Sequence, residues 1–395
     1  MSPPEPNRES IDLLKRMVRI DSVNTESSGR PEAERELAEM LEAEAGRMGL
    51  SSRRLEVPGR GFNLLVEHRV ADDRPWVLLY AHLDTVSAEG MNTPPFEGRE
   101  LGGRIYGRGA LDDKAGGAAA LCALKDYSEG SVRPNNAGVL FVIDEEVTHT
   151  GARSFVESHL QDLGYRPSGI VLCEPTAFVP YVAHSGLLHL DLTTRGLAAH
   201  ASTPERGRSA ITAMAGLIRA LEEDYLPNLT ASDPLCGKAV GSLNRIKGGS
   251  SANIIPDECT VTLDRRIPPG ESLEDVFAGL EGFLGKIRRE HPDWVIEVGK
   301  GRYSPPMTRI PDDGFTKGVL GTLRAMGLPD EPKGAPFGTD AGTFSEAGLS
   351  CVVMGPGNPE KNHQADEYVE VEQVIRGVEV LTSILRMDVK RGMGN

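Results

Sequence analysis

The sequence has no long apolar run and a shortage of positive charge. None of its apolar runs approaches the roughly 18 residues that a membrane span requires, and its first residues lack the apolar core of a secretory signal. We therefore expect a cytoplasmic protein with no membrane partner. Only 43 lysines and arginines stand against 58 aspartates and glutamates, so the formal net charge is −15. This excess of negative charge argues against nucleic acid as a partner.

Cysteine is also scarce, and its placement excludes two kinds of structure. The five cysteines are an odd number and form no C-x-x-C pair. Neither a disulfide framework nor a zinc site built from thiolates is expected. The length of 395 residues, in contrast, exceeds the size at which a single hydrophobic core stops growing. We expect two domains.

Three short apolar runs each end at residues that can bind divalent metals. They are the run 76–81 before His82 and Asp84, the run 138–143 before Asp144, Glu145 and Glu146, and the run 169–173 before Glu174. Such runs are typical of buried strands in a mostly parallel sheet. Ligands of open α/β sheets bind at the carboxyl ends of the strands. A metal site at these strand ends is therefore the first hypothesis.

The order of predicted elements indicates two kinds of fold along the chain. Strands and helices alternate up to about residue 175, which predicts βαβ units. From about residue 180 the order is β-α-β-β-α-β, which is ferredoxin-like. Its predicted elements are 187–194, 208–223, 238–246, 258–267, 273–289 and 294–298. We expect an α/β catalytic domain of residues 1–180 and 300–395, with an inserted βαββαβ domain of residues 181–299.

Two further candidates lie outside the three runs, and each candidate alone has a simpler interpretation. Asp112 precedes a small-residue helix at 116–127, where it could cap the helix, and His363 follows the last apolar run. His82 with Asp84 could be a hydrogen-bonded surface pair, and an acidic run could be a solvated loop. Together, however, five residues offer nitrogen and oxygen ligands: His82, Asp112, Glu146, Glu174 and His363. This set suits two zinc, cobalt or manganese ions that share a carboxylate.

A two-ion site also needs a base. Two ions about 3.5–4 Å apart can acidify a bridging water and polarise a carbonyl if a free carboxylate accepts the proton of the water. Glu145, beside the candidate ligand Glu146, is the natural candidate.

Two other classes of protein stay open. A nucleotide-dependent oxidoreductase would explain the Gly107-x-Gly109 turn, but position 112, where its fingerprint needs a third glycine, is Asp. That interpretation also makes no use of the candidate ligands. A non-catalytic binding protein that kept the fold is the other alternative, and metal binding without amide hydrolysis would distinguish it.

Five motifs resemble a known family, the co-catalytic di-zinc peptidases and deacetylases. The family includes acetylornithine deacetylase, succinyl-diaminopimelate desuccinylase, carboxypeptidase G, tripeptidase T and aminoacylase. The matching segments are 80–86, 106–114, 144–146, 174–176 and 363–368. They span most of the chain in the order of the family, and their combination is far more specific than any one of them.

The resemblance implies a role for each candidate ligand. His82, Asp112 and Glu174 would hold one zinc, and Asp112, Glu146 and His363 the other, with Asp112 as the bridge. Asp84 would orient the imidazole of His82. The peptide bond after Asp112 would be cis, as is typical of the family.

The resemblance also assigns residues of the inserted domain, which would act as a lid and as a dimerisation domain. His200 would donate to the oxyanion in the site of a neighbouring subunit, so a homodimer through residues 181–299 is expected. Arg266 and Asn253 would bind the carboxylate of the substrate. Gly338 and Thr339 match a further loop that contacts substrate.

The implied activity is hydrolysis of an amide in a small-molecule substrate, with two divalent ions per subunit. Zn²⁺ is the first expectation, with Co²⁺ or Mn²⁺ as alternatives. The substrate would be an N-acyl amino acid or short peptide with a free α-carboxylate, and an acetylornithine deacetylase-like activity in amino-acid metabolism fits first. A di- or tripeptidase, a carboxypeptidase or a succinyl-diaminopimelate desuccinylase are the alternatives. Ser185 replaces a lysine found in many deacetylases of the family, which leaves the substrate open.

Overall fold

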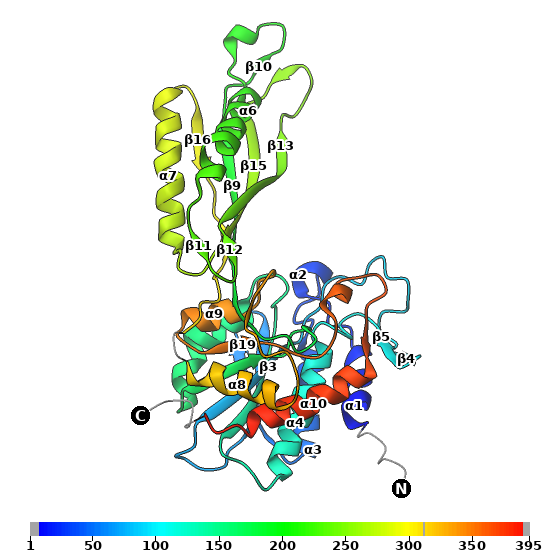
Figure 1. Cartoon of the computed structure of the whole chain (residues 1–395). Coiled ribbons are helices and arrows are strands. Elements are labelled where there is room, and N and C mark those ends of the chain that lie inside the picture. The colour runs from blue at the N-terminus through cyan, green and yellow to red at the C-terminus, as the bar shows by residue number, and fades with distance from the viewer. Residues whose placement is uncertain (1–7, 311–312, 390–395) are drawn as a thin grey trace. The chain divides into compact units, whose positions relative to one another are not determined.

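The computed structural model describes residues 8–310 and 313–389, which divide into two compact units (Figure 1). The first unit takes the chain up to Val182, the segment Arg309–Lys333 and the residues from Thr339 onward. The second unit takes Ala183–Thr308 and Gly334–Gly338. The first unit is thus assembled from segments on both sides of the second in sequence.

The first unit is built on a sheet of order β1-β2-β6-β3-β7-β19-β8-β18, and the chain passes into the second unit within β8 and within β18. Its strands are β1 Ser51–Val57, β2 Gly61–His68, β6 Asn136–Val142, β3 Trp76–His82, β7 Pro167–Leu172, β19 Cys351–Val353, β8 Tyr181–His184 and β18 Lys333–Ala335. The four strands β6, β3, β7 and β19 run parallel, which confirms the predicted parallel sheet at its centre. The pairs β1 with β2, β2 with β6, and β19 with β8 are antiparallel. Apolar periodicity marks a buried strand but not its direction, so these antiparallel pairs could not be predicted.

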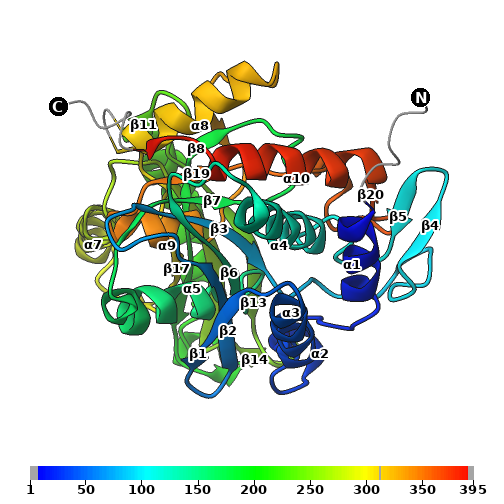
Figure 2. The same ribbon diagram turned by 90° about the horizontal axis from the view of Figure 1, so that it is seen from below.

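The central strands are apolar along their whole length because both faces of the sheet are covered. Every residue of β3 and of β6 is buried, as expected for strands that lie between layers of helices. The buried helix α4, Lys114–Glu129, packs on β3 and β6. The helices α1, Glu9–Val18, and α10, Val371–Leu385, lie beside α4 (Figure 2).

Small residues let the start of α4 approach the strand ends closely. A Cβ atom on Gly116 would lie 2.3 Å from the carbonyl oxygen of Cys173, directly after β7. A Cβ atom on Gly117 would lie 3.2 Å from the ring of Phe141 on β6. The glycines therefore bring the residues just before α4 to the carboxyl edge of the sheet.

The remaining described elements of the first unit are short or peripheral. The remaining α-helices are α2 Thr25–Ser28, α3 Arg35–Arg47, α5 Thr150–Ser154, α8 Gly314–Ala325 and α9 Ala341–Glu346. A small antiparallel sheet contains β4 Arg99–Leu101, β5 Arg104–Tyr106 and β20 Tyr368–Glu370. The pairing of β5 with β20 joins the residues before Asp112 to those after His363.

The second unit has the element order β-α-β-β-α-β. The six elements are β9 Gly186–Arg195, α6 Ala210–Ala220, β13 Val240–Gly248, β15 Glu258–Ile267, α7 Leu273–Glu290 and β16 Val295–Val298. The strand order is β13-β15-β9-β16, and β17, Arg302–Ser304, also pairs with β9. Burial alternates along β9, whose inward leucines pack with apolar side chains of α6 and α7 in one core. The role of this unit as a lid or dimerisation domain stays a prediction.

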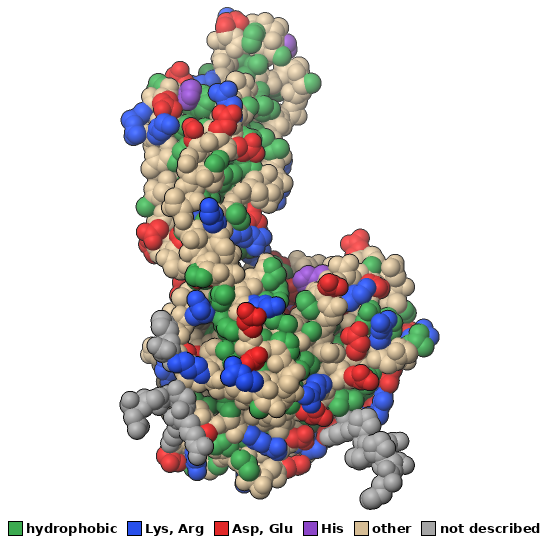
Figure 3. Space-filling model, in the orientation of Figure 1, with side chains coloured by type: hydrophobic (Ala, Val, Ile, Leu, Met, Phe, Trp, Pro, Cys, Tyr) green, Lys and Arg blue, Asp and Glu red, His purple; other side chains and the backbone are tan. Residues whose placement is uncertain are grey.

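The face of the molecule in Figure 3 carries acidic and basic side chains that are interspersed. Among the described residues on that face, the basic side chains form no continuous area. No helix in the described part of the chain combines the length and the hydropathy needed to cross a membrane.

Candidate metal centre

Three neighbouring parallel strands bring the predicted site residues to one edge of the sheet. His82 is the last residue of β3, and Glu145 and Glu146 follow the end of β6. Glu174 comes two residues after β7. His82 lies opposite Val142, so β3 and β6 end at the same level. Leu172, the last residue of β7, lies opposite Tyr80, so β7 ends two residues earlier and Glu174 follows it at about the level of His82. The sheet therefore gathers residues that are far apart in sequence.

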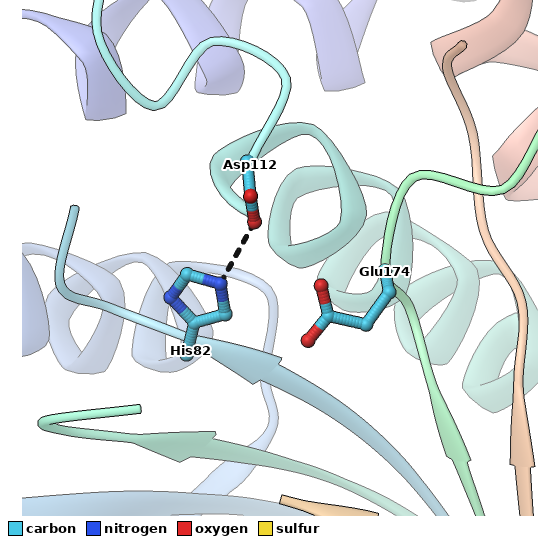
Figure 4. A group of neighbouring side chains, drawn as sticks. All are labelled: His82, Asp112 and Glu174. Atoms are coloured by element: carbon cyan, nitrogen blue, oxygen red, sulfur yellow. Dashed lines mark hydrogen bonds and ion pairs between the residues drawn. The ribbon is translucent and has the colours of Figure 1, made fainter. Parts of the chain in front are cut away.

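The first group of candidate ligands is His82, Asp112 and Glu174 (Figure 4). The Nε2 atom of His82 lies 2.9 Å from Oδ1 of Asp112. The carboxylate of Glu174 points toward this pair, and one ligand atom from each residue lies within 4.8 Å of the others. All three side chains are buried. The spacing leaves room for one cation among them.

The second group is Asp112, Glu146 and His363, and it shares Asp112 with the first. The Nε2 atom of His363 lies 3.1 Å from Oδ2 of Asp112 and 3.2 Å from Oε1 of Glu146. The two oxygens of Asp112 therefore face two different histidines. A carboxylate in this position can bridge two cations.

The electrostatics of both groups favour added positive charge. Burial, aided by the charges of Asp112 and Glu146 and opposed by His82, raises the pKa of Glu174 to about 8. Its Oε1 atom is buried and has no hydrogen-bond partner among the described residues. Burial and the charge of Asp112 raise the pKa of Glu146 as well. Hydrogen bonds to Asp112 and Glu146 raise the pKa of His363 to about 10.

Divalent cations fit this arrangement. Crowded carboxylates with raised pKa values are relieved by a cation at close range. The donors are imidazole nitrogen and carboxylate oxygen, which suit zinc and also cobalt or manganese. The unpartnered oxygen of Glu174 is the clearest sign that this donor set is built for a further positive group.

Asp84 contacts more of the site than the imidazole of His82, which was its only predicted partner. The Nδ1 atom of His82 lies 3.0 Å from the backbone oxygen of Asp84 and 3.5 Å from its Oδ1 atom, so the main chain is the nearer partner. The Asp84 carboxylate accepts hydrogen bonds from the backbone amides of Glu145, at 2.9 Å, and Glu146, at 3.0 Å. Asp84 therefore fixes the backbone that carries the candidate base and a candidate ligand.

A buried polar cluster lies behind Asp84. Asn24 donates to Oδ2 of Asp84 at 2.7 Å and to Oδ1 of Asp144 at 2.9 Å. Asp144, which also accepts from Thr148, is thereby engaged in fixing its own loop. Burial, together with the charges of Asp84 and Asp144, raises the pKa of Glu34 to about 8. Sequence reasoning missed Asn24 and Glu34 because nothing in their local pattern points to the strand ends.

A second carboxylate holds the segment that ends at Asp112. Oε1 of Glu367 accepts the backbone amides of Leu111, at 3.0 Å, and Asp112, at 3.3 Å. Its Oε2 atom pairs with the buried Arg108. The peptide bond between Asp112 and Asp113 is cis, as predicted. Glu367 lies within the predicted motif after His363, but its supporting contacts were not foreseen.

A third group joins the predicted base Glu145 to two residues that are not among the predicted site residues, His149 and Asp340. Glu145, His149 and Asp340 each offer a polar atom within 4.8 Å of the others. Burial raises the pKa of Glu145 well above its usual value, and the charges of Glu174, Asp340 and Glu146 act in the same direction. His149 is a single histidine in a loop, and Asp340 lies 191 residues away from it. No local signal links the two.

Two predicted residues of the second unit lie side by side there. The short strands β10, Ala199–His200, and β14, Ile254–Ile255, pair with each other, and the amide of Ala201 donates to the backbone oxygen of Asn253 at 2.9 Å. The backbone amide of Ser202 donates to Nδ1 of His200 at 3.2 Å. Because Nδ1 accepts this bond, a neutral His200 carries its proton on Nε2. His200 is exposed, so that N–H can reach a ligand.

The other predicted contact residues have partners of their own. Arg266 is partly exposed on β15, and its guanidinium pairs with both oxygens of Asp264, at 2.9 and 3.2 Å. Arg265 is buried on the opposite face and pairs with Glu271, as strand alternation predicts. Gly338 belongs to the second unit and the buried Thr339 to the first, where the Thr339 hydroxyl accepts the amide of Ala341 at 3.1 Å.

Comparisons with known proteins agree on one family. A model of peptidase family M20/M25/M40 matches residues 78–387. An acetylornithine deacetylase of Myxococcus xanthus is 31% identical over 314 residues, which cover 78% of this chain and 79% of that protein. A Staphylococcus epidermidis protein named probable succinyl-diaminopimelate desuccinylase is 24% identical over 424 residues, with 96% and 97% coverage.

Solved structures share the fold. A metallo-carboxypeptidase of the M20 family from Sulfolobus solfataricus has a TM-score of 0.79 at 17% identity, covering 97% of this chain and 99% of that one. A dinuclear metal-binding peptidase of the M20 family from Bacillus subtilis has a TM-score of 0.71 at 16% identity, covering 95% and 96%.

The buried Glu34 makes the stability of the fold depend on pH. Its carboxyl has a pKa near 8 in the folded chain against an ordinary value of 4.5. The stability that this shift contributes is fully present below the ordinary pKa and is lost as pH rises toward the pKa of the folded chain. Over this range the free energy of unfolding falls by up to about 1.4 kcal/mol per pH unit. Glu34→Gln should therefore gain stability relative to the wild type between pH 5 and 8, measured by urea unfolding. The exposed Glu36→Gln serves as control, and a constant difference for Glu34→Gln would contradict the assignment.

The shared position of Asp112 predicts how metal content responds to mutation. Asp112→Ala should lose both of about two bound ions, whereas His363→Ala should lose about one, because only Asp112 belongs to both groups. Metal is measured by mass spectrometry after dialysis against zinc, with circular dichroism to verify folding. The exposed Asp162→Asn is the matched control. Full metal content in Asp112→Ala would rule out the bridge.

Proposed function

This chain belongs to peptidase family M20/M25/M40, and on that premise we propose that it cleaves the amide bond of an N-acyl amino acid or short peptide with a free α-carboxylate. It is a metallohydrolase of amide or peptide bonds. The observation that carries the proposal is the position of Asp112, whose two oxygens face His82 and His363. The buried Glu145 directly precedes the candidate ligand Glu146 in the sequence.

The five predicted ligands would hold two divalent ions. His82 and Glu174 would bind the first, Glu146 and His363 the second, and Asp112 both. Bound there, the ions would polarise the scissile carbonyl and acidify a water molecule. Zinc is our first choice, and cobalt or manganese would suit the same donors.

Glu145 would act as the base. Its backbone is fixed by the hydrogen bond from its amide to Asp84. As a buried carboxylate beside the candidate ligand Glu146, it could accept a proton from the attacking water and then release it to the leaving amine. Unlike Glu146, it belongs to neither of the two ligand groups that share Asp112.

Residues of the second unit would bind and polarise the substrate. His200, with its proton on Nε2, would donate to the oxyanion, a contribution often worth about 3–4 kcal/mol per donor. Arg266 and Asn253 would bind the α-carboxylate, and Arg266 would exchange Asp264 for it. Gly338 and Thr339, where the chain passes from the second unit back to the first, would contact the substrate as well. A homodimer through residues 181–299 would let His200 serve the site of a partner.

The substrate is proposed to be an acetylated amino acid of the acetylornithine type. The support is the 31% identity to an acetylornithine deacetylase. Ser185 in place of the lysine common in deacetylases keeps desuccinylase and peptidase activities as alternatives. The cytoplasmic location stays a prediction.

Replacing Glu145 should separate metal binding from turnover. Glu145→Gln should keep about two ions but lose about 10²–10⁴-fold in kcat, because the amide cannot accept a proton. The assay is a panel of acetylornithine, succinyl-diaminopimelate, a dipeptide, a tripeptide and a simple N-acyl amino acid, coupled to metal analysis. The exposed Glu157→Gln is the control. Wild-type turnover by Glu145→Gln on any substrate would refute the role of the base.

Mixing two inactive variants tests the role of His200. His200→Ala should depress kcat without changing metal content. If His200 acts in a partner subunit, mixing the His200→Ala and Glu145→Gln variants should restore about a quarter of wild-type turnover. Half of the dimers that form at random contain one chain of each variant, and each of these dimers has one complete site out of two. Subunit exchange is verified with differently tagged chains. No recovery in exchanged dimers would show that each chain uses its own His200.

A further inference from the structure

We infer that His149 is a positioning residue for Glu145, and that a buried chain of hydrogen bonds through Asp340 to Tyr80 holds His149 in place. This inference rests on the proposed role of Glu145 as the base. Tyr80, Glu145, His149 and Asp340 all belong to the first unit.

The chain begins inside the central sheet. Tyr80 lies on β3, two residues before His82, and is fully buried. Its hydroxyl donates to Oδ2 of Asp340 at 2.6 Å. Its ring meets Phe344 of α9 edge to face, with centroids 5.6 Å apart. Asp340, just before α9 and fully buried, is therefore anchored to the central sheet.

Asp340 in turn fixes the imidazole of His149. Its Oδ1 atom lies 2.8 Å from Nδ1 of His149. An ionised carboxylate can only accept, so with Asp340 ionised Nδ1 of His149 carries the proton of this hydrogen bond. The backbone of His149 is held as well, since its amide donates to the carbonyl oxygen of Asp144 at 2.7 Å. His149 has a left-handed backbone, with φ at 57°, as it enters α5.

The fixed imidazole stands beside the carboxylate of Glu145. Nδ1 of His149 lies 4.0 Å from Oε1 of Glu145, which is too far for a hydrogen bond but places the two side chains next to each other. The Glu145 backbone is fixed from the other side by Asp84. A glutamate side chain has several rotatable bonds, and a fixed neighbour reduces the conformations available to it. His149 would thus keep the carboxylate where it can reach the attacking water.

The same three residues, Glu145, His149 and Asp340, could instead hold a cation. Both oxygens of Asp340 already accept hydrogen bonds, from Tyr80 and from His149. A cation there would have to displace the His149 proton. The hydrogen-bonded arrangement is therefore the one that the contacts favour.

Two substitutions of His149 test the inference against a merely structural role. Asparagine can place an N–H group near the position of Nδ1 and tolerates a left-handed backbone, whereas glutamine reaches further and is the matched control. His149→Asn should retain most of the wild-type kcat, while His149→Gln and His149→Ala should lose about 10- to 100-fold. KM, metal content and Tm should stay near the wild-type values in all three.

The hydroxyl of Tyr80 provides an independent test of the chain of hydrogen bonds. Tyr80→Phe removes the donor to Asp340 and keeps the ring. It should lower kcat on its own but have little further effect in a His149→Ala background, because both changes release the same imidazole contact. Fully additive losses would show that Tyr80 and His149 act separately.

The outcomes distinguish this inference from the proposed function. Activity in Glu145→Gln would refute the base itself, whatever His149 does. An inactive Glu145→Gln together with wild-type kcat in His149→Gln and His149→Ala would overturn the positioning role alone. Loss of bound metal in His149→Ala would also overturn the positioning role. So would an equal loss of kcat in all three His149 variants that accompanies a drop in Tm.

Discussion

Buried negative charge at the carboxyl ends of β3, β6 and β7 is the constraint on which the site depends. Asp112, Glu146 and Glu174 are brought within a few ångströms of two histidines, and burial raises the pKa values of both glutamates. Isolated buried carboxylates are costly, and a protein keeps them charged only beside positive partners. The parallel strands and the glycines of α4 hold the carboxylates in this unfavourable proximity. A pair of divalent ions would neutralise these carboxylates and remove the repulsion between them.

Three further carboxylates, which are not candidate ligands themselves, support the centre through hydrogen bonds to other parts of the chain. Asp84 accepts the amides of Glu145 and Glu146, and Glu367 accepts the amides before and at Asp112. Asp340 joins Tyr80 to His149. Such partners orient the groups that do the chemistry and reduce their freedom to move. Their own negative charge adds to the demand for cations nearby.

Much of the fold and three of the five candidate ligands, His82, Glu146 and Glu174, could be predicted from local signals. Short apolar runs mark the central strands, and ligand-type residues follow them directly. The residues next to Glu145 gave no such signal: His149 is a lone loop histidine, and its partner Asp340 is 191 residues away. Only the folded chain brings them together. The pairing of Arg266 with Asp264 was also missed, because strand alternation places both side chains on one face but does not say that they bind each other.

The central claim is that Asp112 is shared by two cations. The most direct measurement is a crystal structure of the zinc-loaded protein with anomalous diffraction data collected on both sides of the zinc absorption edge. We expect two anomalous peaks about 3.5–4 Å apart, each in contact with a different oxygen of Asp112. A single peak, or a second peak that does not touch Asp112, would contradict the account.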